Sequence, residues 1–279
     1  MVEKLLALQE RIYTYYNREY PFSLSYSPRI SFAKLGEFYE LNYFGDGYDE
    51  DITLSPDEIE QNDDLDFAFC AVLDFIIAHP NSFVSLNFNG PDAGANGVRN
   101  WNFNRLVESG VVLSHVKSFK VGLTNMGDHH VTLIGEYDLE EGVIAKLVAK
   151  MPKLKVLQMP SAPDKSFFEL DNLKIEELVI QSGLNHQNFV TNLSRSKNMR
   201  SLRLLDFTDV FEMAEDTGKT KFTSVMEYME LFKSELFQHT PNFLFKLRDC
   251  HLSVSNSSML KRLANVQLLH IVEVPGRYR

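Results

Sequence analysis

The sequence predicts an α/β fold in which short strands alternate with helices. From residue 82 onward, five segments carry apolar residues at positions 1, 4 and 6 of a short extended run. These segments begin at Val116, Leu154, Ile175, Met199 and Val266, and two weaker ones begin at Phe83 and Leu247. Stretches with the apolar spacing of helices lie between them. This alternation is typical of a parallel sheet covered by helices.

The helical stretches each lead toward the next strand candidate. They cover residues 103–109, 139–150, 189–196 and 257–264. A longer helical insertion over residues 223–237 places Val225, Met229 and Phe232 on one face. The steps from Leu154 to Ile175 and from Ile175 to Met199 are 21 and 24 residues long, which are lengths of a single strand–helix repeat.

The N-terminal region has a different composition. Eight of the eleven tyrosines lie before residue 50. Apolar spacing predicts a helix over residues 3–18, a strand over 37–44 and a helix over 65–78, and Ser55 with its following proline has the form of a helix start. We therefore expect an aromatic, acidic α+β capping region at 1–80, followed by a repeat domain at 81–279.

Three segments, around Leu154, Met199 and Val266, resemble the leucine-rich-repeat core L-x-x-L-x-L-x-x-N/C-x-L. The resemblance covers roughly residues 82–273 and identifies the chain as a divergent, bacterial-type leucine-rich-repeat protein. It implies a solenoid, in which a curved parallel sheet carries helices on its convex side. A lone strand–helix unit cannot cover its apolar edge, so stacked units bury one continuous core.

The repeats also depart from that family. Position 9, where Asn or Cys is expected, holds Thr124, Ala162, Gly183 and Phe207. The backbone groups that this side chain normally binds must then be satisfied by water or by tighter turns. A doubly wound α/β sheet, which also alternates strand and helix, is the alternative fold.

The net charge of −10 is concentrated in one interval. Between Lys34 and Arg99 there is no Lys or Arg but there are fourteen acidic residues, whereas the rest of the chain has 24 acidic and 28 basic residues. A local negative field disfavours nucleic acid and speeds the capture of a basic protein. The candidate binding residues in this acidic segment are Asp46, Asp49, Glu50 and Asp51.

Residues that carry chemistry are sparse. Asp128, His129 and His130 form the one tight histidine cluster, and we expect it to be a solvent-exposed turn. The acidic run that starts at Asp46 fails the calcium-loop spacing, and the glycines at 90–97 lack the Lys and Ser/Thr of a phosphate loop. The sequence therefore predicts no catalytic residues, no metal and no cofactor. An uncharacterised metal-assisted hydrolase using the histidine cluster is the alternative.

The repeat pattern predicts a surface, because residues that flank the buried positions point to the opposite face of the sheet. The candidate binding residues on this concave face are Lys120, Gln158, Glu177, Gln181, Arg203, Asp249, His251 and His270. They mix charges of both signs with amides, a composition that suits a protein partner better than a polyanion.

These observations predict a non-enzymatic protein-binding module, either an adaptor or a neutralising, immunity-like or inhibitor-like partner of a basic protein. A scaffold with no discrete ligand is a further alternative. No stretch reaches the roughly 20 apolar residues of a membrane span, and the start of the chain is too polar for a signal peptide. With Cys70 and Cys250 expected to be reduced thiols, the predicted location is cytoplasmic. The sequence leaves the partner and the oligomeric state open.

Overall fold

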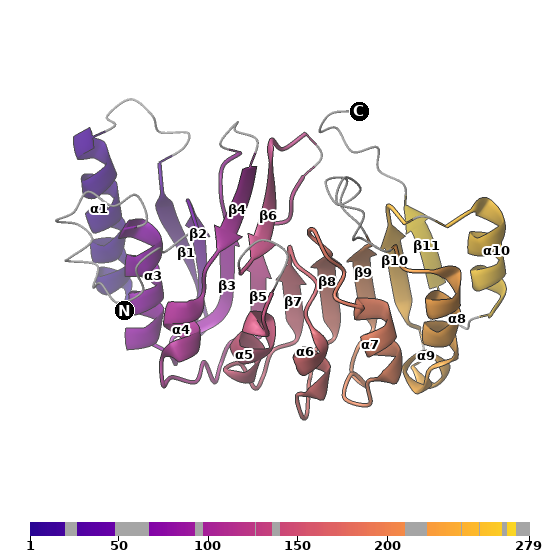
Figure 1. Ribbon diagram of the computed structural model, residues 1–279. Coiled ribbons are helices and arrows are strands. Elements are labelled where there is room, and N and C mark those ends of the chain that lie inside the picture. Colours follow the sequence, from indigo (N-terminus) through magenta and orange to yellow (C-terminus); the bar gives the residue numbers. More distant parts are fainter. Residues whose placement is uncertain are drawn as a thin grey trace.

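A computed structural model describes residues 1–19, 27–47, 67–92, 97–125, 127–135, 140–209, 222–240, 242–250, 252–263 and 267–271. Within them the fold is mixed α/β, with a mostly parallel nine-stranded sheet and helices ranged along it (Figure 1). The predicted α/β class is confirmed.

The described residues of the N-terminal region contribute two helices and two strands to this fold. They are α1 (Val2–Glu19), β1 (Arg29–Leu35), β2 (Phe38–Phe44) and α3 (Phe67–Ala78). The predicted helices at 3–18 and 65–78 and the strand at 37–44 correspond to α1, α3 and β2, whereas β1, which pairs antiparallel with β2, was not predicted. The helix start at Ser55 lies outside the described residues.

Seven further strands continue the sheet in parallel. They are β3 (Phe83–Asn89), β5 (Ser118–Val121), β7 (Val156–Met159), β8 (Glu177–Gln181), β9 (Leu204–Thr208), β10 (Leu244–Arg248) and β11 (Gln267–Ile271). The strand order is β1-β2-β3-β5-β7-β8-β9-β10-β11, which is also their order along the chain. Because β2 pairs directly with β3, the predicted boundary at residue 80 falls inside one sheet.

The helices of this part lie between the strands in sequence and on one side of them in space (Figure 1). They are α4 (Asn104–Glu108), α5 (Val143–Ala149), α6 (Lys165–Glu169), α7 (Phe189–Arg195), α8 (Val225–Lys233), α9 (Glu235–His239) and α10 (Val254–Leu263). Parallel crossovers are right-handed, so strands that follow one another in a single direction place all their helices on the same face. We call the opposite face, on which none of the described helices lies, the outward face.

A row of buried side chains crosses the helix side of the sheet. Directly paired positions on seven strands are Leu86, Phe119, Leu157, Leu178, Leu205, Phe245 and Leu268. Each of these side chains is at most 9% exposed. One continuous apolar core therefore joins every strand from β3 to β11.

A second sheet has two parallel strands, β4 (Gly97–Trp101) and β6 (His130–Ile134). β4 lies between β3 and α4 in sequence, and β6 lies between β5 and α5, so the same insertion occurs in two successive strand–helix units. The two insertions pair with each other. Neither strand was predicted.

The last three strands correct the predicted register. The predicted run began at Met199, but β9 begins at Leu204. The apolar residues here are three apart, so the pattern fits a strand that starts at either position. Met199 and Leu202 instead form a turn, in which the Leu202 N–H donates to the Met199 carbonyl. β10 begins at Leu244 instead of Leu247. In β11 the prediction chose the wrong one of two adjacent leucines, since Leu269 is 48% exposed.

Two helix predictions also need correction. The single helix predicted over 223–237 is two helices, because Ser234 is extended between α8 and α9. The helix α6 was not predicted. Among the described residues, none of the helices combines the length and the apolar character that crossing a bilayer requires. Both cysteines are free thiols, as expected.

Candidate functional site

The outward face presents a row of side chains that runs from β2 to β11. Its directly paired members are Asn42, Asn87, Lys120, Gln158, Val179, Asp206, Lys246 and Leu269. Most of them are half-buried or exposed, and Lys120 is exposed. The predicted binding residues Lys120, Gln158, Glu177 and Gln181 occupy outward positions of β5, β7 and β8.

The other four predicted binding residues fall elsewhere. Arg203 is exposed immediately before β9, and Asp249 follows β10 with a left-handed φ of 48°. His251 lies outside the described residues. The placement of His270 on this face was wrong, because its Nδ1 lies 3.2 Å from the hydroxyl of Ser257 on α10. The register error in β11 explains the mistake.

Gln181 is on the outward face but is only 6% exposed. Its amide oxygen accepts from the backbone N–H of Thr124 (2.9 Å), and its amide nitrogen donates to the Thr124 carbonyl (3.0 Å). Thr124 is one of the positions where the repeat pattern lacks its usual Asn or Cys. A side chain from β8, two strands away from β5 in the sheet, therefore binds this backbone segment, in place of the expected water or tight turn, and Gln181 has a structural role.

An ion-pair cluster on β9 and β10 was missed by the sequence analysis. Arg248 makes two bonds to Asp206, at 2.6 Å and 3.1 Å, and Lys246 lies 3.8 Å from the same carboxylate. The predicted frame placed Asp206 outside the strand, so the outward positions of β9 and β10 were assigned to other residues. Correct register would have identified all three.

Of the predicted acidic segment, the structure describes only Asp46. Its carboxylate lies 3.2 Å from Nε of Arg99 and is 57% exposed. Asp49, Glu50 and Asp51 lie outside the described residues.

The predicted histidine cluster has a different partner from the one expected. Asp92, which follows β3, lies 2.7 Å from Nδ1 of His129 and 3.0 Å from Nδ1 of His130, whereas Asp128 accepts from the backbone and side chain of Asn125. The interpretation as a solvent-exposed turn is wrong for His130, which begins β6 and is 5% exposed. No group of three potential ligands among the described residues could hold a metal ion.

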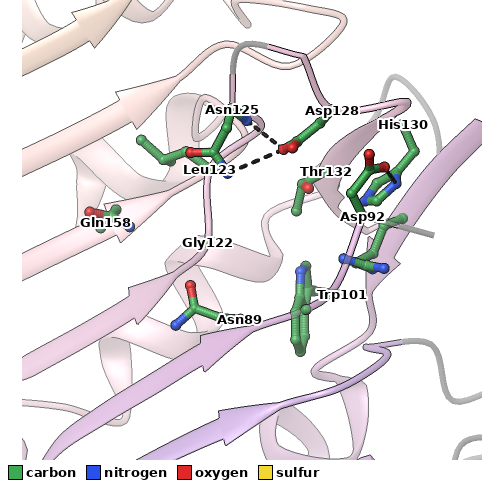
Figure 2. Close-up of a pocket in the computed structure, with 12 residues that line it drawn as sticks. Asn89, Asp92, Trp101, Gly122, Leu123, Asn125, Asp128, His130, Thr132 and Gln158 are labelled. Carbon is green, nitrogen blue, oxygen red and sulfur yellow. Dashed lines mark hydrogen bonds and ion pairs between the residues drawn. The ribbon is translucent and has the colours of Figure 1, made fainter. Parts of the chain in front are cut away.

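Asp92, Asp128 and His130 line a pocket of about 370 Å³ between the two sheets, which we call the polar pocket. It is formed where β3 and β5 end, with β4 and β6 forming the other wall (Figure 2). Its lining residues are Asn89, Gly90, Asp92, Arg99, Trp101, Gly122, Leu123, Asn125, Asp128, His130, Thr132 and Gln158. Ligands of open α/β sheets often bind at the carboxyl ends of the strands, which is where this pocket lies.

Two glycines allow the chain to pack against the floor of the polar pocket. A Cβ on Gly47 would lie 2.2 Å from the indole ring of Trp101, and a Cβ on Gly90 would lie 2.5 Å from the guanidinium of Arg99. Only glycine permits such a close approach. The segments after β2 and β3 thereby enclose Trp101, which is fully buried.

A separate buried cluster lies at the end of β9. Asp209 is fully buried and accepts hydrogen bonds from the hydroxyls of Thr223 (2.7 Å) and Tyr228 (2.9 Å). Nearby, the Cys250 thiol lies 3.2 Å from Nε2 of His270, and burial raises the pKa of this thiol to about 11. The thiol is thus protonated at neutral pH, and this cysteine–histidine contact is not an activated nucleophile.

Burial raises the pKa of Asp209 above its ordinary value of 3.8, although the two hydroxyl bonds oppose the rise. The folded chain therefore holds this proton more tightly than the unfolded chain, and the associated stability is lost as pH rises through the folded pKa. The Asp209→Asn variant is neutral at every pH. As pH rises above about 4, the wild type loses this contribution to its stability and the variant does not. We therefore expect the unfolding free energy of the variant to increase relative to that of the wild type. Urea unfolding of both proteins between acid and neutral pH measures this difference, and a constant difference would contradict the prediction.

Comparisons with known proteins found no matching family model, no matching curated protein and no matching solved structure.

Proposed function

We propose that this chain is a non-enzymatic protein-binding module that folds as a leucine-rich-repeat-like solenoid and binds its partner through the outward face. The observation that carries the proposal is the placement of every crossover helix on one side of the sheet. The opposite face of the nine-stranded sheet is thereby left free of the described helices. Repeat architectures use such extended faces for binding.

The chemistry of this face supports a protein partner. Exposed or half-buried amides and aliphatic groups, such as Gln158 and Val179, alternate with charges of both signs. The middle row contains Lys120 and Lys246 but also Asp206, so it has no stripe of a single sign. Mixed polar and apolar composition is typical of protein interfaces, whereas polyanion sites are strongly basic.

The preference for a basic partner rests on the fourteen acidic residues between Lys34 and Arg99. In the sequence, this interval includes strands β2 and β3. We propose that the acidic interval accelerates encounter and that the outward face supplies the contacts that persist. A cytoplasmic adaptor or a neutralising partner of a basic protein fits this combination.

Charge reversal on each face tests the proposal. We expect Lys120→Glu combined with Glu177→Lys to weaken recovery of the native partner at least tenfold. The matched control, Lys146→Glu with Glu230→Lys, reverses the same two charges on exposed positions of α5 and α8. Affinity purification from the source cells with quantitative mass spectrometry provides the measurement. Equal loss in both double variants, or no loss in either, contradicts binding through the outward face.

The acidic interval is tested by kinetics instead of recovery. Replacing Asp49, Glu50 and Asp51 by their amides is expected to slow association with the purified partner and to reduce its salt dependence. The dissociation rate should change little. An association rate that is insensitive to salt in the wild type would remove the argument for a basic partner.

A further inference from the structure

We propose that the polar pocket binds a small, uncharged, polyhydroxylated molecule of about the size of a sugar monomer or cyclitol. This pocket borders the outward face proposed for the protein partner, since Gln158 belongs to both. The two proposals are tested with different variants, so each can fail without the other.

The strongest observation is a buried donor that lacks an acceptor. Trp101 is 0% exposed and lines the pocket, and its indole N–H makes no hydrogen bond to any residue that the structure describes. Such a group costs about 1–3 kcal/mol when it remains unpaired. In Figure 2 the indole nitrogen is at the end of the ring turned toward Thr132. A ligand oxygen in the cavity would supply the missing acceptor.

The indole ring itself is not available for stacking. Phe103 lies nearly parallel to it, with an interplanar angle of 14°, and Gly47 packs against its atoms. Trp101 therefore offers the ligand its N–H, not its face. Binding here depends on hydrogen bonds, and an aromatic or aliphatic ligand gains little.

Arg99 is a second donor at the same wall. Its side chain is 7% exposed, and among the described residues only Asp46 accepts from its guanidinium, through Nε. Arg99 lines the pocket, so its terminal amino groups can donate to the same ligand. Trp101 and Arg99 together require oxygen acceptors.

The carboxylates of the pocket require hydrogen-bond donors from the ligand, whereas Trp101 and Arg99 require acceptors. Asp92 and Asp128 also line the pocket and act as acceptors, Asp128 already receiving two bonds from Asn125. A carboxylate or phosphate ligand would meet these two negative charges, and a cation would meet Arg99. A neutral ligand that both donates and accepts satisfies all four residues. The hydroxyl group does both, so a ring of hydroxyls is the best match.

Size and lining restrict the ligand further. The volume of about 370 Å³ is near the lower end of the range for ligand pockets, about 300–1,000 Å³. Leu123 is the only aliphatic side chain among the lining residues, which also present the amides of Asn89 and Gln158 and the hydroxyl of Thr132. Because such groups bind water well, we expect dissociation constants of about 0.1–10 mM.

The chain contains a single tryptophan, so Trp101 reports on the site without a label. We propose titrating the full chain with D-glucose, D-galactose, D-ribose and myo-inositol to about 50 mM, well above the expected constants. The readouts are tryptophan fluorescence and the NMR resonance of the indole N–H. We expect a saturable shift of both with at least one of these compounds, and no shift with acetate, inorganic phosphate or methylammonium.

Two pocket variants and one control distinguish binding from a bulk effect. Thr132→Val and Asp128→Asn are expected to weaken the response about tenfold each, the loss of one good hydrogen bond. Ser118→Ala, on the outward face and outside the pocket, should leave it unchanged. Thermal unfolding establishes that each variant is folded.

The proposal is overturned if no polyol moves the indole resonance, which would mean that water alone occupies the pocket. It is also overturned if the shift is linear and equal in all variants. Saturable binding of acetate, phosphate or methylammonium in place of the polyols would show that the site selects a charged ligand.

Discussion

The Glu140→Ala variant is expected to lose about 3–5 kcal/mol of unfolding free energy, the largest effect of any single change proposed here. Glu140 is 2% exposed and lies just before α5. Its carboxylate accepts from the backbone N–H groups of Gly142 (3.2 Å), Ile144 and Asp164 (3.1 Å). Removing the carboxylate leaves three N–H groups without this acceptor.

This carboxylate joins two successive helices. Asp164 is the N-cap of α6 and accepts from Ser166 (2.8 Å), so Glu140 fixes the start of α5 to the start of α6. Burial raises the pKa of Glu140, while the backbone donors oppose that rise. Glu140→Gln retains one acceptor oxygen and is expected to lose about half as much stability.

Urea unfolding at neutral pH measures both variants. Lys146→Ala, on the exposed side of α5, serves as the control and is expected to change stability by less than about 0.5 kcal/mol. A loss below about 1 kcal/mol for Glu140→Ala would show that water replaces the carboxylate at these N–H groups.

The second large effect is expected for Gln181→Ala, which should lose about 2–4 kcal/mol. The change removes both partners of the Thr124 backbone, a buried N–H and a buried carbonyl. Thr124 in turn accepts from the N–H of Thr132 through its hydroxyl (2.9 Å), so its displacement would loosen β6. The effect of this outward-facing residue is therefore on folding, although the sequence placed it among the binding residues.

Gln158→Ala provides a matched comparison. Gln158 is also an outward glutamine, and its amide donates to the carbonyl of Val121 (3.0 Å). It is only half-buried and borders the polar pocket, so water can replace it and the expected loss is below about 1 kcal/mol. Urea unfolding compares the two variants, and equal losses would contradict the structural role assigned to Gln181.

The alternation of strands and helices was predictable because apolar spacing is a local property of the chain. Strands β3, β5, β7 and β8 were placed correctly, since each has one frame that buries its apolar residues. The predicted register was wrong where the apolar spacing fits more than one set of buried positions. Met199, Leu202 and Leu205 are three apart, and Leu268 is adjacent to Leu269, so neighbouring strands had to decide which residue is buried.

The polar pocket could not be predicted in the same way. Its walls β4 and β6 carry Arg99, Asn100 and Thr132 among their apolar residues, so neither shows a clear alternation of apolar and polar residues. Among the described strands, each of them pairs only with the other. The contact between Asp92 and His129 joins residues 37 apart through two loops. The sequence identified the histidines as unusual but contained no local signal for their partner.

The paired insertions have a mechanical consequence for the sheet. Units that touch only their neighbours can separate one at a time from an end, as in a stack. β4 and β6 add a second connection between successive units, and Gln181 extends it to β8. Within the described chain no such insertion joins β10 and β11, whose outermost Leu269 is half exposed. Opening of the sheet should therefore begin at the C-terminal strands and stop at the units that β4, β6 and Gln181 connect. These connected units contain the polar pocket, which should keep its shape while the C-terminal end moves.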